Sequence, residues 1–269
     1  MNYTEISKMT VLAEKNRLSV DNENAKPLLK AFGLGDYLDY YLEFRHIPPW
    51  SKYNPNGYHV IDHDLNVVVN AFEIAVNKGL DAKEMKQLLL AALYHDFWHT
   101  QTLQSEYSGG DIVNIDNAKK GWMNAVQRTK GAHLEVESVE EISNLIEHSI
   151  YPRKKSVGKK KLASILCDAD LIGFCTMPED VAVKAVYGLA IETLMNGFHE
   201  VYQNPALVLS KGEIRLFFEK QSVFRITNVW LNRVSSLKAL THNWQLKHRA
   251  ACVIAEQNLK DPAWFETLT

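Results

Sequence analysis

The chain has 269 residues, of which 46% are hydrophobic and 23% are charged, the composition of a globular protein that can bury a sizeable core. Lys and Arg total 30 against 32 for Asp and Glu, a net charge of −2, which argues against a nucleic-acid-binding surface or an anionic-membrane partner. The three cysteines lack metal-ligand spacing, and the polar N-terminus does not resemble a signal peptide. No apolar run approaches the ~20 residues of a membrane helix. These features predict a reduced, cytoplasmic protein.

Glycine and proline are concentrated in a few stretches, and these predict loops at 46–58, 104–117 and 152–160. Between the loops, apolar residues recur at helical spacing, and no series of alternating strands with hairpin turns competes with that pattern. The sequence therefore predicts an all-α fold.

Two of the predicted helices begin at capping boxes. Asp81 with Glu84 opens one, and Ser138 with Glu141 opens another that must end before Pro152. Apolar stripes predict further helices over 161–174 and 211–240.

Histidines gather at two points along the chain. His59 and His63 are four residues apart, so they share a face if the segment is helical. His95, Asp96 and His99 follow at the end of the helix opened at residue 81, where both histidines continue its apolar stripe. Ionisable groups on a buried face need partners, and a cation satisfies imidazole and carboxylate together.

A third segment supplies further carboxylates. Asp168 and Asp170 lie inside an apolar helix, and the periodicity places Asp170 nearer the buried face. His148 lies on the buried side of the preceding helix, where an ordinary core histidine is an equal alternative. A site that joins His63 to Asp170 requires distant helices to pack together, which favours one domain over two.

The order H…HD…D resembles the signature of the HD-domain metal-dependent phosphohydrolases. YHVIDH (58–63) and HDFWH (95–99) resemble the YHNxxH and HDxxH motifs of class I cyclic-nucleotide phosphodiesterases, and QSVF (221–224) resembles their QxxF element. Val60 replaces the motif's asparagine, and Thr100 follows HDFWH where a glycine is frequent. The resemblance implies a single helical HD domain with a core of about 40–235 and helical additions at 1–40 and 240–269.

The resemblance also implies a cofactor of one or two divalent ions, Mn, Mg, Zn, Fe or Ni. Its protein ligands would be His63, His95, Asp96 and Asp170, and the ions would activate water for attack on a phosphodiester.

Further residues carry roles implied in the same way. His59 is the candidate general acid, and His99 would hydrogen-bond the bridging water or complete a second metal shell. His148 and Asp168 are candidates for a second metal or for orienting a ligand. Gln221 and Phe224 would hold a purine, with a surface amide as the equal alternative for Gln221.

The predicted function is hydrolysis of a cyclic or related nucleotide, with small-molecule phosphoesters as partners and a possible homodimer. An HD-type nucleotidase or dNTP phosphohydrolase is the alternative. An HD-type di-iron oxygenase ranks lower because few extra histidines are available, and a non-catalytic binding module is disfavoured because every core ligand is present. The basic run at 153–161 is interpreted as a solvated loop, with phosphate binding as the functional alternative.

Overall fold

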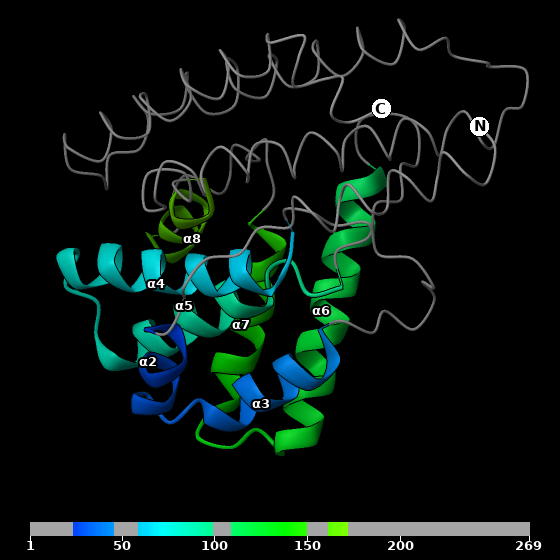
Figure 1. Cartoon of the computed structure of the whole chain (residues 1–269), viewed down its shortest axis with the longest axis horizontal. Coiled ribbons are helices and arrows are strands. Elements are labelled where there is room, and N and C mark those ends of the chain that lie inside the picture. Colours follow the sequence, from blue (N-terminus) through cyan, green and yellow to red (C-terminus); the bar gives the residue numbers. More distant parts are fainter. Residues whose placement is uncertain (1–23, 46–58, 99–108, 150–160, 172–269) are drawn as a thin grey trace, which may run out of the picture.

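The structure, a computed structural model, describes residues 24–45, 59–98, 109–149 and 161–171 (Figure 1). The described part contains seven helices and no strand, which confirms the all-α prediction. The helices are α2 (Ala25–Ala31), α3 (Gly35–Phe44), α4 (Ile61–Asn77), α5 (Ala82–Tyr94), α6 (Gly109–Thr129), α7 (Val136–Glu147) and α8 (Lys161–Leu171). The helix predicted over 211–240, the C-terminal addition predicted at 240–269 and residues 1–23 of the N-terminal addition predicted at 1–40 lie outside the described residues.

Helix α5 is the centre of the described fold. It packs against α3, α4, α6, α7 and α8, and every residue from Leu88 to Tyr94 is buried. From Leu88 onward the helix is apolar on all sides, and such a segment must be surrounded by other helices. Its predicted capping box is confirmed, with the Glu84 amide donating to Asp81 Oδ1 at 2.8 Å and the Asp81 amide donating to Glu84 Oε2 at 3.2 Å.

The connection between α4 and α5 brings the two histidine segments to the same end of the fold. Helix α4 ends at Asn77, and Gly79 adopts a left-handed φ of 63° that lets the amide of Leu80 donate back to the carbonyl of Ala75. Helix α5 starts two residues after Leu80. Since so short a connection joins antiparallel neighbours, the first turn of α4 lies beside the last turn of α5.

An aromatic cluster joins α3 to the central helix. Tyr37 stacks on Trp122 of α6, and Tyr41 meets Tyr94 of α5 edge to face. The Tyr94 hydroxyl donates to the Tyr37 carbonyl at 2.8 Å, and the Trp122 indole donates to the Val139 carbonyl at 3.1 Å. The Tyr94 bond therefore ties α3 to α5, and the Trp122 bond ties α6 to α7.

Two boundaries differ from the sequence predictions. Helix α7 begins at Val136, and Ser138 lies inside its first turn instead of capping it. The Ser138 hydroxyl is buried and accepts a hydrogen bond from Gln87 of α5 at 3.1 Å, so a tertiary contact replaces the predicted cap. The predicted loop at 104–117 is wrong from Gly109 onward, because burial of Asn117, Ala118 and Trp122 extends α6 into a polar, glycine-containing stretch.

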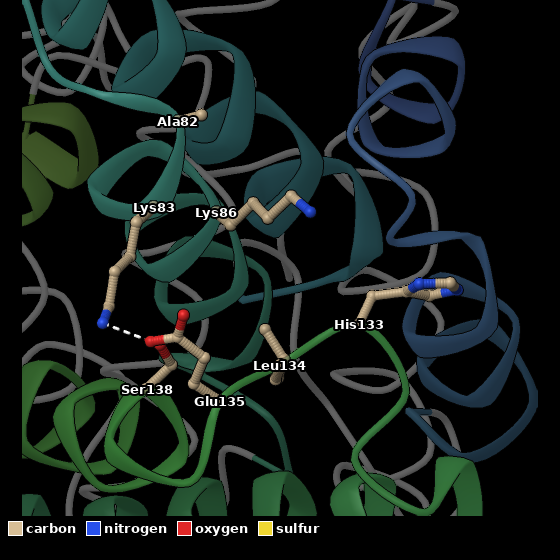
Figure 2. A pocket seen from close by; sticks show the side chains of 7 residues that line it. All are labelled: Ala82, Lys83, Lys86, His133, Leu134, Glu135 and Ser138. Carbon is tan, nitrogen blue, oxygen red and sulfur yellow. Dashed lines mark hydrogen bonds and ion pairs between the residues drawn. The ribbon is translucent and has the colours of Figure 1, made fainter.

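A small hollow lies where α5 begins, beside the connection from α6 to α7 (Figure 2). An ion pair between Lys83 and Glu135 crosses it. The hollow is lined by Ala82, Lys83, Lys86, His133, Leu134, Glu135 and Ser138. It lies at the opposite end of α5 from His95.

Within the described ranges, no helix combines the length and apolarity that a membrane crossing requires.

Candidate metal centre

Four side chains from three helical segments converge at the end of α5. His63 lies in the first turn of α4, His95 and Asp96 directly follow α5, and Asp170 belongs to α8. His63 Nε2 is 3.4 Å from Asp96 Oδ2 and 3.2 Å from Asp170 Oδ1. His95 Nε2 is 3.1 Å from Asp96 Oδ2 and 3.8 Å from Asp170 Oδ1. Residues separated by more than a hundred positions thus present two nitrogens and two oxygens to one point.

The orientation of His95 is set by its own helix. Its Nδ1 lies 2.8 Å from the carbonyl oxygen of Ala92, an acceptor, so Nδ1 carries the proton. When the ring is neutral, as metal binding requires, its unprotonated Nε2 points into the cluster. This atom is buried and makes no hydrogen bond to any described residue, although the two carboxylates lie nearby. A backbone bond at one ring nitrogen that directs the other is the usual arrangement around metal-binding histidines.

Charge couples the four groups strongly. Burial lowers the pKa of His63, but its bonds to the carboxylates of Asp170 and Asp96 outweigh burial and raise the pKa to about 9. Burial opposes charge on His95 as well, yet the neighbouring Asp96 carboxylate raises its pKa well above the ordinary value. Despite burial, the imidazoles lower the pKa of Asp96 and of Asp170. Without a metal, therefore, protons on the imidazoles balance the two carboxylates.

A second carboxylate network lies beside this cluster. Asp64 is fully buried, and its Oδ2 accepts hydrogen bonds from the Tyr41 hydroxyl and from Arg45 Nε, the latter at 2.8 Å. Arg45 is itself buried, and its Nη2 donates to the carbonyl of His59 at 3.1 Å. These three residues are not among the site residues predicted from the sequence. A usable signal existed, because Tyr37, Tyr41 and Arg45 follow one another at four-residue spacing and thus continue one buried face.

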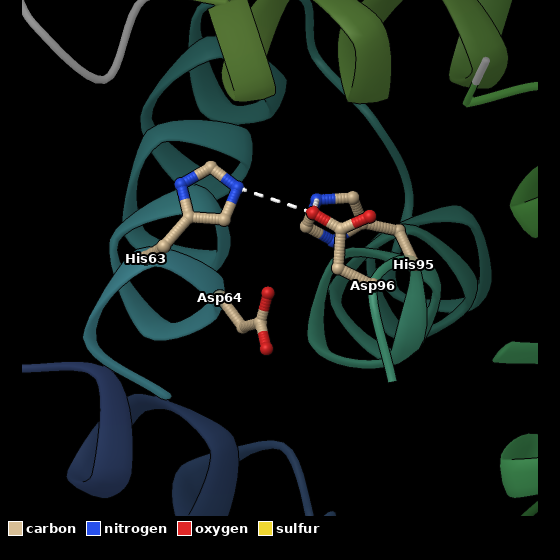
Figure 3. Close-up of side chains that lie close together, drawn as sticks. All are labelled: His63, Asp64, His95 and Asp96. Atoms are coloured by element: carbon tan, nitrogen blue, oxygen red, sulfur yellow. Dashed lines mark ion pairs between the residues drawn. The ribbon is translucent and has the colours of Figure 1, made fainter. Parts of the chain in front are cut away.

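His63, Asp64, His95 and Asp96 form a group that could hold a metal ion. One ligand atom from each lies within 4.8 Å of the others (Figure 3). His63 and Asp64 are fully buried, and the side chain of Asp96 is 17% exposed. Nitrogen and carboxylate donors in this combination suit Zn, Mn, Fe or Ni.

The predicted neighbours of the cluster occupy different positions. His59 precedes α4 and is not helical, but its ring centroid is 5.6 Å from that of His63 and its Nε2 is 3.9 Å from Asp96 Oδ2. Asp168 is more buried than Asp170, contrary to the periodicity argument, since Asp168 is 5% exposed and the Asp170 side chain 27%. Asp170 lies near the C-terminal end of α8, where its carboxylate is partly exposed and still reaches His63.

The remaining predicted site residues are not brought into the described cluster. His148 caps the end of α7, and its carbonyl lies 3.3 Å from Cys167 Sγ of α8. Its predicted role stays a prediction. His99, Gln221 and Phe224 lie outside the described residues.

No family model matches this sequence, and no curated protein sequence matches it significantly. The functional assignment of this chain therefore rests on its own residues and their geometry.

Proposed function

We propose that this protein is a metal-dependent phosphohydrolase of the HD type that acts on a phosphodiester of a cyclic or related nucleotide. The observation that carries the proposal is the convergence of His63, the His95–Asp96 pair and Asp170 on one point. The order of these residues in the chain is that of the H…HD…D pattern, and the fold that joins them is helical.

Asp170 is the better fourth ligand than Asp64. Two nitrogen or oxygen atoms that bind the same ion lie ~3.3–3.6 Å from each other when the coordination is tetrahedral. Neighbouring ligand atoms lie ~2.8–3.0 Å from each other when it is octahedral. The four contacts between the two imidazole nitrogens and the oxygens of Asp96 and Asp170 span 3.1 to 3.8 Å, which suits either geometry after small adjustments. Asp64 instead directs one oxygen to Arg45 and Tyr41, so its charge is already balanced.

The charge balance also favours a divalent ion. With Asp64 paired to Arg45, the carboxylates of Asp96 and Asp170 and the two imidazoles remain. Exchange of the two imidazole protons for one divalent cation leaves the buried charge unchanged. The alternative of burying unpaired carboxylates would be costly.

When bound, a divalent ion would lower the pKa of a water nucleophile and neutralise charge on the phosphoryl group. The chain itself supplies the proton for the leaving oxygen. His59 is suited to that role because it lies beside the cluster, 3.9 Å from Asp96, and its side chain is 19% exposed where His63 is fully buried. The hydrogen bond from Arg45 to the His59 carbonyl fixes the backbone that carries this ring.

The proposal is tested with purified full-length protein, freed of metal and then loaded with Mn, Mg, Zn or Ni. Substrates would be cAMP, cGMP, cyclic dinucleotides, dNTPs and bis-p-nitrophenyl phosphate. We expect metal-dependent turnover that Asp96→Asn reduces at least 100-fold, because the variant loses a charged ligand shared by both imidazoles. The matched control is Asp116→Asn, which changes an exposed carboxylate on α6 and should retain full activity. Absence of turnover on every phosphoester with every metal would refute the proposal.

His59→Ala separates proton donation from metal binding. It should slow hydrolysis of substrates with poor leaving groups by about 100-fold, while bis-p-nitrophenyl phosphate, whose leaving group needs no proton, should be affected far less. An equal loss on both substrates would contradict the assigned role of His59.

A further inference from the structure

Asn70 of α4 makes a directional contact with α8. Its side-chain Nδ2 donates to the main-chain carbonyl of Ala169 at 3.2 Å, and Asn70 is only 1% exposed. Ala169 immediately precedes Asp170, whose Oδ1 is 3.2 Å from His63 Nε2. Asn70 therefore holds the backbone of α8 one residue away from the carboxylate that reaches the histidines.

The polar contacts that His63 and Asn70 make with α8 come from one face of α4. Asn70 follows His63 by seven residues, which is about two helical turns. His63 meets the Asp170 side chain while Asn70 meets the Ala169 carbonyl. Together they define both the rotation and the axial position of α8 against α4.

Apolar packing between helices does not set that position with the same accuracy. Burial of apolar area is non-directional, and one residue of slippage along α8 would shift its backbone by ~1.5 Å and rotate its side chains by ~100°. A metal ligand has to be held within ~0.5 Å of its productive position. A buried amide bonded to a single carbonyl supplies such a constraint.

We propose that Asn70 is a positioning residue that sets the register of α8 so that Asp170 completes the metal-ligand set. The inference rests on the proposed role of Asp170 as a ligand. Asn70 itself contacts neither metal nor substrate, and it acts through the Ala169 backbone alone.

The test measures metal affinity, using Mn²⁺ and Zn²⁺ titrated into the metal-free full-length chain by calorimetry. Asn70→Ala is expected to weaken metal binding about 10- to 100-fold, the range typical of residues that orient ligands. The matched control is Asn77→Ala on the same helix. Asn77 also donates to a backbone carbonyl, but that carbonyl belongs to Glu73 of its own helix and the bond is exposed, so its removal should leave metal affinity within twofold.

A double-mutant cycle separates positioning from general destabilisation. Asp170→Asn should retain weaker binding through the other three ligands, and Asn70→Ala in that background should cause less than a twofold further loss. Equal losses in both backgrounds would overturn the inference, as would unchanged affinity in the single Asn70→Ala variant. If Asp170→Asn itself leaves affinity unchanged, the proposed ligand set is wrong, and that result is distinct from a failure of the Asn70 inference.

Thermal unfolding in the presence of a chelator controls for folding. Asn70→Leu, which removes the donor but keeps the branched shape of the side chain, replaces Asn70→Ala if the latter does not fold. A purely structural role would lower the unfolding midpoint in chelator and leave the increase produced by metal intact. A positioning role predicts that the metal-induced increase itself shrinks.

Discussion

Gly121 of α6 is required by the close approach of the ring that follows the His95–Asp96 pair. A Cβ built on Gly121 would lie 2.6 Å from Phe97 Cε1, 2.8 Å from Phe97 Cγ and closer still to Cδ1. Phe97 is fully buried and stacks against Tyr40, so its ring has little space to move. Gly121→Ala therefore perturbs the turn that carries Asp96.

The size of the perturbation follows from the contact distances. Ordinary contacts begin at 3.4 Å, so relieving the Cε1 contact alone requires the ring to move by 0.8 Å, the difference between 3.4 and 2.6 Å, and the closer Cδ1 contact requires a larger movement. Overpacking of this kind costs about 1–3 kcal/mol, and alanine regains ~1 kcal/mol of helix propensity over glycine. The net change in folding free energy is then only about 0–2 kcal/mol. A shift of Asp96 beyond ~0.5 Å, however, should weaken metal binding 10-fold or more.

The assay pairs metal titration with thermal unfolding for Gly121→Ala and for Gly35→Ala. Gly35 is the matched control, because a Cβ there would meet Lys30 Cγ at an ordinary 3.6 Å. We expect Gly35→Ala to bind metal as the parent does. Replacing Phe97 by Leu in the Gly121→Ala background should recover part of the lost affinity. Parental metal affinity in Gly121→Ala would refute the link between this packing and the site.

Two further predictions concern the charges around the cluster. Arg45→Met should destabilise the protein by about 3–5 kcal/mol in urea unfolding, because it leaves the Asp64 carboxylate buried without its cation. Adding Asp64→Leu should recover most of that loss, and failure to do so would contradict the pairing. In chelator, the urea midpoint should fall as pH rises from about 6.5 to about 9. The pKa of His63 is about 9 in the folded protein and 6.5 in its ordinary state, so the bound proton stabilises the folded state fully below pH 6.5. This stabilisation is lost as the pH rises through 9 and the proton dissociates. Saturating metal should abolish this decline, and a midpoint that is flat over the same interval in chelator would contradict the charge coupling.

Local patterns determined much of the described fold. The apolar stripe of α5 and its Asp81–Glu84 capping box were readable because both depend on residues within one turn of each other. The boundaries at Ser138 and Gly109 were not, since Ser138 is bound to Gln87 of another helix and the start of α6 depends on packing. Tertiary contacts outweigh such weak local preferences.

The same division applies to the site. The sequence predicted that His63, His95, Asp96 and Asp170 act together, because histidines on an apolar face are conspicuous and the chain order resembles the H…HD…D pattern. The tertiary structure decided that their donor atoms meet within 3.1 to 3.8 Å, that Asp64 is neutralised by Arg45, and that Asn70 holds α8 beside them. A sequence indicates which buried ionisable side chains require a partner. The partner itself depends on how the α4–α5 connection and the α8 register bring distant backbones together, and that is fixed only by packing in three dimensions.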